Sequence, residues 1–102
     1  INLGCPVNKA RRSGFGGVLL KDENLELLKK IVSSIVKTSK KIVSAKMRLG
    51  FDEIVAVERA KLLEDLGVEF LTVHGRSVKQ MYKGEANYEE IKKVIKNVNI
   101  PV

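Results

Sequence analysis

The chain has 102 residues, of which 44% are hydrophobic and 30% are charged, a composition typical of one small globular unit. No apolar run approaches the roughly 20 residues of a membrane span, and no basic leader with an apolar block opens the chain, so we expect neither a membrane protein nor a secreted one. The single cysteine, Cys5, excludes an internal disulfide and a multi-cysteine metal site, and it favours a reducing, cytoplasmic setting.

The net charge of +7 is unevenly distributed along the chain. Residues 1–50 carry eleven Lys and Arg against three Asp and Glu, whereas residues 51–102 carry eight against nine. A basic cluster gains affinity for nucleic acid by releasing counterions, so a phosphate-rich partner is one interpretation. The other is that many lysines coat solvated helix faces. Charge alone leaves both open.

Short apolar runs alternate with segments of helical period along the chain, which is typical of βα units with a parallel sheet. Residues 1–3 predict the end of a strand, and a long loop follows at residues 4–21. Residues 22–37 predict an amphipathic helix with Asp22 as a plausible N-cap. Residues 42–49 predict a second strand, which finishes in two cations, Lys46 and Arg48.

The second half of the chain repeats this alternation. Asp52 can cap a helix whose apolar stripe runs over residues 55–66, before Gly67 stops it. Residues 70–73 predict a strand ending at His74, residues 88–98 a shorter helix, and residues 100–102 the beginning of another strand. The ends of the chain would then be open β-edges, so we expect an α/β fold made of about three consecutive βα units of a larger parallel barrel.

In a parallel α/β barrel the reactive side chains gather where the strands end. Three such places can be found here, at residues 2–6, 46–50 and 73–76, and together they could point Asn, Cys, Lys, Arg and His side chains into one cavity. Singly, Cys5 is more often a small buried hydrophobe and His74 an ordinary hydrogen-bonded histidine. Lys46 is the most pointed oddity, because an ammonium in an apolar strand is costly unless it meets an anion or an electron-rich ligand.

The glycine-rich stretch at residues 14–17 is only loosely similar to a phosphate-binding loop. It lacks the Lys-Ser/Thr pair of a P-loop and the full dinucleotide fingerprint. We therefore expect these glycines to serve tight loop packing.

Taken together, the motifs resemble the tRNA-dihydrouridine synthase family. The matching stretches are NLGCPV (2–7), GFGGVLL (14–20), KMRLG (46–50), LTVHGR (71–76) and QMYKGEANY (80–88), in the family's order and spacing. The resemblance covers essentially all 102 residues but only the middle of the family's catalytic domain. It implies that residues 1–102 are a single fragment of an FMN-binding TIM barrel, without the early strands, the later FMN-phosphate loops and the tRNA-binding helical domain.

The resemblance implies an FMN-dependent oxidoreductase that reduces the C5–C6 double bond of selected uridines in tRNA, with NADPH reducing the flavin. By position, Cys5 is similar to the general acid that protonates C5 while reduced flavin delivers hydride to C6. Lys46 and His74 match the flavin-contacting positions, and Asn2 and Arg48 match those that hold the uracil. Arg76 carries no firm assignment, and no metal is implied.

The chemistry of the reaction agrees with these assignments. Hydride at C6 leaves enolate-like charge on the ring, so the site needs a proton donor and hydrogen-bond donors near the carbonyls. Cys5 must stay protonated, so we expect it in a partly desolvated turn without a tight cation partner. The base must also be flipped out of its stack. Three cations lie where phosphates around a flipped base could bind: Lys9, Arg11 and Arg12.

Two other interpretations stay open. An FMN barrel acting on free pyrimidines, such as a dihydropyrimidine or dihydroorotate dehydrogenase, also presents a cysteine in an Asn-x-x-Cys-Pro turn, although the stretch from 74 to 86 and the basic loop argue against it. The other is a catalytically inactive half-barrel that serves as a folding or assembly unit. For residues 1–102 alone we expect weak or no FMN binding, no activity, and self-association that covers the open barrel edges.

Overall fold

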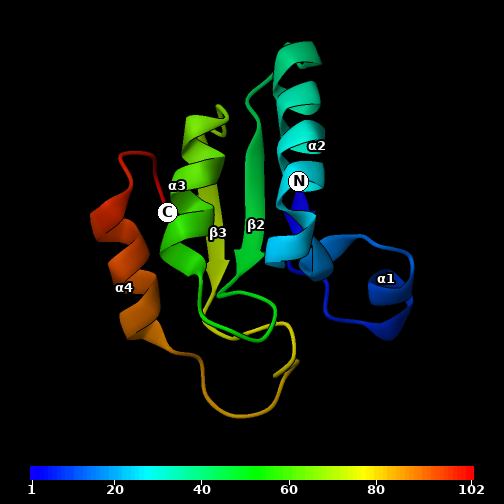
Figure 1. Ribbon diagram of the computed structural model, residues 1–102. Coiled ribbons are helices and arrows are strands. Elements are labelled where there is room, and N and C mark those ends of the chain that lie inside the picture. Colours follow the sequence, from blue (N-terminus) through cyan, green and yellow to red (C-terminus); the bar gives the residue numbers. More distant parts are fainter.

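Three parallel strands form one sheet in the computed structural model, which describes residues 1–102 (Figure 1). The strands are β1 (Asn2–Leu3), β2 (Ser44–Arg48) and β3 (Phe70–His74), in the order β1-β2-β3. Parallel neighbours require a crossover, and helix α2 (Leu25–Thr38) supplies the first and helix α3 (Ala56–Asp65) the second. Helix α4 (Tyr88–Asn97) follows β3. The expected α/β fold of three βα units is confirmed.

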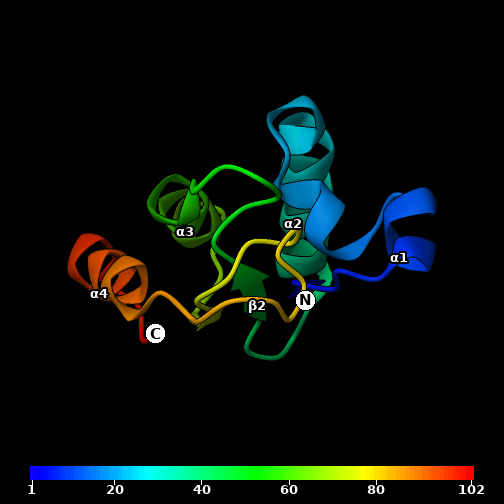
Figure 2. The same cartoon turned by 90° about the horizontal axis from the view of Figure 1, so that it is seen from below.

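The two faces of the sheet differ because side chains alternate along each strand. Leu3, Met47 and Leu71 are buried on the face that the helices cover. On the other face, the register places Asn2 beside Lys46 and Lys46 beside Thr72, with Arg48 beside His74 one step further along. Seen from below, α2, α3 and α4 surround one side of β2 and leave the other side open (Figure 2).

Each helix contributes apolar side chains to one core. Leu28 and Val32 of α2, Leu63 of α3 and Val94 of α4 are fully buried together with Leu3 and Met47 of the sheet. Burying such a side chain stabilises the fold by about 1.5 to 3 kcal/mol relative to leaving it in water. The apolar residues that predicted a helix at residues 22–37 thus form the face of α2 that packs on the sheet.

Residues 4–21 are more regular than the predicted loop. They contain a one-turn helix, α1 (Asn8–Arg12), and a 3-10 turn, η1 (Gly16–Leu20). A helix of five residues is too short to show an apolar period, which is why the pattern missed it. Both short elements pack against each other at the β1 end of the sheet.

Neither predicted N-cap is correct. Asp22 lies in a second 3-10 turn, η2 (Asp22–Asn24), and pairs with Arg59, so α2 begins after it at Leu25. Asp52 pairs with Lys79 at 2.7 Å, and Val55 is the residue that precedes α3. In both cases the carboxylate that was expected to cap the helix forms an ion pair with a cation from another part of the chain.

The strand expected at residues 100–102 is not formed. The carbonyl of Pro101 accepts one hydrogen bond, from the backbone N–H of Leu71 at 2.9 Å, which brings this segment to the free edge of β3. One such bond does not make a ladder. None of the helices combines the length and the apolar character that a membrane crossing requires.

Candidate active site

The loops that follow the three strands gather at the carboxyl end of the sheet, the lower end in Figure 1. Asn2, Lys46, Arg48 and His74 share the open face of the sheet, and Cys5 follows β1 directly. The structure therefore brings together five of the residues that the sequence singled out.

The turn after β1 is built around the Asn2 side chain. Its Oδ1 accepts hydrogen bonds from the backbone N–H of Gly4 at 3.0 Å and of Cys5 at 3.2 Å. Because the oxygen is used inside the turn, the amide NH2 is the part of Asn2 that remains to donate to a ligand. The free thiol of Cys5 is half-buried and makes no hydrogen bond, in agreement with the expected partly desolvated turn.

The glycines of η1 pack directly on Cys5. The N–H of Gly17 donates to the Cys5 carbonyl at 3.1 Å, and a Cβ on Gly16 would lie 2.7 Å from the Cys5 Cβ. Gly16 also has a φ of 70°, which side chains rarely adopt. The prediction of tight packing at residues 14–17 agrees with these contacts for Gly16 and Gly17 but not for Gly14, where a Cβ would meet nothing within 4 Å.

Arg48 is buried, with only 3% of its surface exposed, and it joins the loops on either side of β2. Its Nε donates to the Gly4 carbonyl at 3.0 Å, and its Nη1 donates to the carbonyls of Ser77 at 3.0 Å and Met81 at 2.6 Å. Burial lowers the pKa of the guanidinium. These bonds leave Nη2 as the nitrogen without a protein partner, so Arg48 can fix the loops and still offer donors to a ligand.

One of the Arg48 hydrogen bonds holds Met81 in an unusual backbone conformation. Its φ of 53° is the one positive value among the non-glycine residues. A backbone in this region costs energy that the surroundings must offset. The charge-assisted bond from Arg48 to the Met81 carbonyl provides that offset.

An open hollow of about 410 Å³ lies beside β3. Its polar lining comes from Lys46, Thr72, His74, Arg76 and Tyr88, and no carboxylate lines it. Burial lowers the pKa of His74, and the nearby charges of Arg48, Lys46 and Arg76 lower it further. Such a cationic, donor-rich hollow suits a ligand with acceptor atoms or negative charge, as a flavin ring system has.

A sequence model of the family described as Dihydrouridine synthase (Dus) matches residues 1–102, the whole chain. The chain belongs to this family. It is 40% identical over 104 residues to tRNA-dihydrouridine synthase B of Proteus vulgaris, covering 100% of this chain and 32% of that protein. It is 38% identical to tRNA-dihydrouridine synthase B of Pasteurella multocida, covering 100% of this chain and 31% of that protein. It is 42% identical to probable tRNA-dihydrouridine synthase 1 of Synechocystis sp., covering 100% of this chain and 29% of that protein.

The Dus chain therefore spans about a third of the length of the curated relatives that it matches. Its three βα units are consistent with part of a TIM barrel, the architecture that the resemblance implied. The open face of the sheet corresponds to the inner side of such a barrel wall, because the helices lie on the outside.

The three cations of α1 lie apart from the hollow in this Dus chain. Helix α1 is beyond the β1 edge of the sheet (Figures 1 and 2), and Lys9, Arg11 and Arg12 are exposed and form no ion pair. Arg11 lies 5.1 Å from the centre of the Phe51 ring, and Lys21 lies 4.7 Å from the same centre. Neither Lys21 nor Phe51 could be singled out from the sequence, because only the fold brings them to Arg11.

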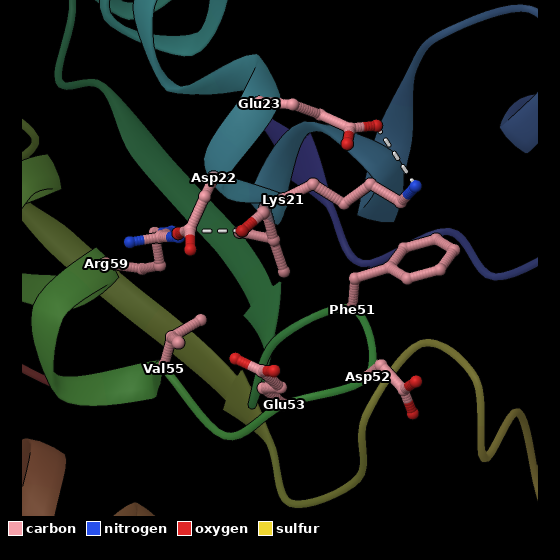
Figure 3. Close-up of a pocket in the computed structure, with 9 residues that line it drawn as sticks. Lys21, Asp22, Glu23, Phe51, Asp52, Glu53, Val55 and Arg59 are labelled. Carbon is pink, nitrogen blue, oxygen red and sulfur yellow. Dashed lines mark hydrogen bonds and ion pairs between the residues drawn. The ribbon is translucent and has the colours of Figure 1, made fainter.

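A second hollow of about 340 Å³ lies between η2 and the loop after β2 (Figure 3). None of the expected site residues lines it. Both cations that line it are already paired, Arg59 with Asp22 and Lys21 with Glu23. Arg59 also donates through Nε to the Leu20 carbonyl at 3.0 Å, so this region of the Dus fold acts as a clasp between η1, η2 and α3. No group of three metal-ligating side chains is present.

Proposed function

We propose that the protein is a tRNA-dihydrouridine synthase, an FMN-dependent oxidoreductase that uses NADPH to reduce the C5–C6 double bond of uridine in tRNA. The observation that carries the proposal is the position of Asn2, Lys46, Arg48 and His74 on one face of the sheet, with Cys5 in the turn that follows β1. Membership of the Dus family supports it. A tRNA substrate also implies a cytoplasmic enzyme.

Lys46 and His74 are the residues that would hold the flavin. Lys46 is exposed on the open face without a carboxylate partner, so the burial cost expected from its apolar strand does not arise and its ammonium is free for a ligand. When bound, FMN supplies the hydride that NADPH provides. The protein contributes orientation and electrostatics to that chemistry.

Cys5 is the proposed proton donor. Its thiol proton goes to C5 of the uracil as a hydride reaches C6, and the thiolate then takes a proton from water. The amide NH2 of Asn2 and the Nη2 of Arg48 are the proposed donors toward the uracil carbonyls, where negative charge develops. Both groups are held by backbone bonds, so they need little reorganisation during the reaction.

The exposed cations of α1 are the proposed contacts to tRNA phosphates. Lys9, Arg11 and Arg12 follow Cys5 by four to seven positions, which suits phosphates that flank a flipped base. Lys21 contacts the same Phe51 ring as Arg11 but is paired with Glu23, so it is not counted among these contacts.

The test is incubation of the full-length protein with NADPH and either unmodified tRNA or free uracil, followed by mass spectrometry of the nucleosides and bases. We expect uridines of the tRNA to gain the mass of one H2 while free uracil stays unchanged. A gain only in free uracil would contradict the proposal and would favour a pyrimidine dehydrogenase.

We further propose that residues 1–102 are one segment of the catalytic barrel and bind FMN weakly or not at all on their own. The chain covers about a third of its relatives, so much of a barrel wall lies in their remaining residues. Flavin titration of a protein of residues 1–102 tests this, and tight stoichiometric binding would contradict it.

A further inference from the structure

Arg76 and His74 contact each other on the segment that leaves β3. The Nη1 of Arg76 lies 3.3 Å from the Nε2 of His74, and the Nε of Arg76 donates to the Gly84 carbonyl at 3.1 Å. A guanidinium has only N–H donors, so this contact is a hydrogen bond only when Nε2 of His74 accepts. An accepting Nε2 carries no proton, and the neutral ring then carries its proton on Nδ1.

We propose that Arg76 is a positioning residue that fixes His74 as the neutral Nδ1–H tautomer and so makes the ring a hydrogen-bond donor to the ligand of the hollow. The Nδ1 atom has no hydrogen-bond partner in the protein and is open to solvent, because no buried side-chain nitrogen or oxygen is left without a partner. The charged side chains around the hollow, Lys46 and Arg76, are donors themselves. A ligand in the hollow would therefore meet an unpaired Nδ1–H donor, which a carbonyl oxygen or an unprotonated ring nitrogen can accept.

The surroundings of His74 keep the ring neutral. Burial lowers its pKa, and three cations act in the same direction: Arg48 and Lys46 from β2 and Arg76 from its own segment. The other titratable group at the hollow is Tyr88 at the start of α4. No carboxylate lines the hollow, so no negative charge stabilises a doubly protonated His74 ring. Such a ring could not accept the hydrogen bond from Arg76.

The tautomer of His74 does not depend on the proposed function. The identification of the acceptor as FMN does rest on the proposed function. Histidine 15N NMR of the full-length protein without flavin separates the two. His74 signals are assigned by their loss in His74→Gln. We expect the shift of Nε2 to be that of an unprotonated nitrogen and the shift of Nδ1 to be that of a protonated one, above the titration of the ring.

Two variants test the part played by Arg76. In Arg76→Met the donor and the charge are lost, so we expect both tautomers to be populated and the titration midpoint of His74 to rise. Arg76→Lys keeps a cationic donor and should restore the Nδ1–H form. Protonated Nε2 in the wild-type protein, or an unchanged tautomer in a folded Arg76→Met, would overturn the proposal. If Arg76→Met does not fold, the wild-type spectrum alone decides.

Addition of FMN to the wild-type protein tests the ligand half of the proposal. We expect the Nδ1–H resonance to shift when FMN binds and not in the presence of flavin-free buffer. Bound FMN with an unshifted Nδ1–H would overturn this half. An enzyme that fails to reduce tRNA while showing the expected tautomer would overturn the proposed function and leave the role of Arg76 standing.

Discussion

The position of the Cys5 thiol is set by its neighbours. Asn2 holds the backbone of the turn from one side, and Gly16 and Gly17 close on it from the other. The proposed proton donor therefore sits in a turn with little room for displacement. Small changes in this packing should therefore affect both the reaction and the stability of the fold.

Replacement of Gly16 tests that packing. Gly14 and Gly16 both have positive φ, 75° and 70°, but a Cβ on Gly14 meets nothing within 4 Å. Gly14→Ala should cost about 1 to 2 kcal/mol of backbone strain. Gly16→Ala should cost about 1 to 3 kcal/mol more, because its Cβ collides with Cys5, and a displaced thiol should slow tRNA reduction about 10²-fold.

Denaturant unfolding and steady-state rates of the two glycine variants provide the measurement. Equal unfolding free energies and equal rates for Gly14→Ala and Gly16→Ala would contradict the packing of η1 on Cys5.

The lowered pKa of His74 predicts a pH dependence of stability. Its ordinary value is 6.5, and burial with three nearby cations lowers it in the folded state. As pH falls below 6.5 the unfolded chain takes up a proton that the folded protein does not, so the unfolding free energy decreases until the folded pKa is reached. Above 6.5 both states are neutral at this ring and the contribution vanishes.

The comparison of unfolding free energies above and below pH 6.5 in wild type and His74→Gln checks this sign. The variant should lose less stability on acidification than wild type. Glu26, whose pKa is lowered by a hydrogen bond and charge from Lys29, acts below its ordinary 4.5 and does not interfere. An identical loss in both proteins would refute the assignment.

At the scale of elements, Arg59 ties the connection after β1 to helix α3. It is buried and donates to the Leu20 carbonyl. It also pairs with Asp22, which lies beside it in Figure 3. This clasp holds η1, and with it the glycines that pack on Cys5. The burial of Arg59 on α3 is thus explained by its bonds to the Leu20 carbonyl and to Asp22.

Removal of the clasp should destabilise the protein. Arg59→Met leaves the Leu20 carbonyl without its donor, at a cost of about 1 to 3 kcal/mol. Lys79→Met is the matched control, because the Lys79–Asp52 pair is well exposed and its loss should cost less than about 1 kcal/mol. Unfolding free energies of the two variants decide the point. A loss in Arg59→Met no larger than in Lys79→Met would count against the clasp.

Helices α2, α3 and α4 and strands β2 and β3 were predictable because each is long enough to show its own period. The caps were not, because Asp22 and Asp52 each have a distant cation as partner, and sequence spacing carries no information about it. For the same reason the pairing of Arg48 with three backbone carbonyls could not be foreseen. The convergence of Asn2, Lys46, Arg48 and His74 could be predicted, because a parallel register fixes which strand ends meet.

At the scale of the whole molecule, charge separates into two regions. The cationic hollow beside β3 suits a small ligand, whereas the cations of α1 lie beyond the opposite edge of the sheet on an exposed surface. The proposed function assigns FMN to the first region and tRNA phosphates to the second.

Neutralisation of the α1 cations should reduce the salt dependence of tRNA binding. Replacement of Lys9, Arg11 and Arg12 by Gln should weaken binding and lower the slope of log K against log[salt] by about two to three. The matched control replaces three exposed lysines at the far end of α2 and after it, Lys37, Lys40 and Lys41, with the same change in net charge. An equal change of slope in both triple variants would refute a specific phosphate track on α1.

The central claim is that Cys5 donates the proton during reduction of uridine in tRNA. Its most direct test is the single-turnover rate of dihydrouridine formation in the full-length protein, reduced beforehand with NADPH, compared between wild type, Cys5→Ala and Lys79→Met. We expect a rate about 10² to 10⁴-fold lower in Cys5→Ala, because a general acid is lost, and an unchanged rate in Lys79→Met. A wild-type rate in Cys5→Ala would contradict it.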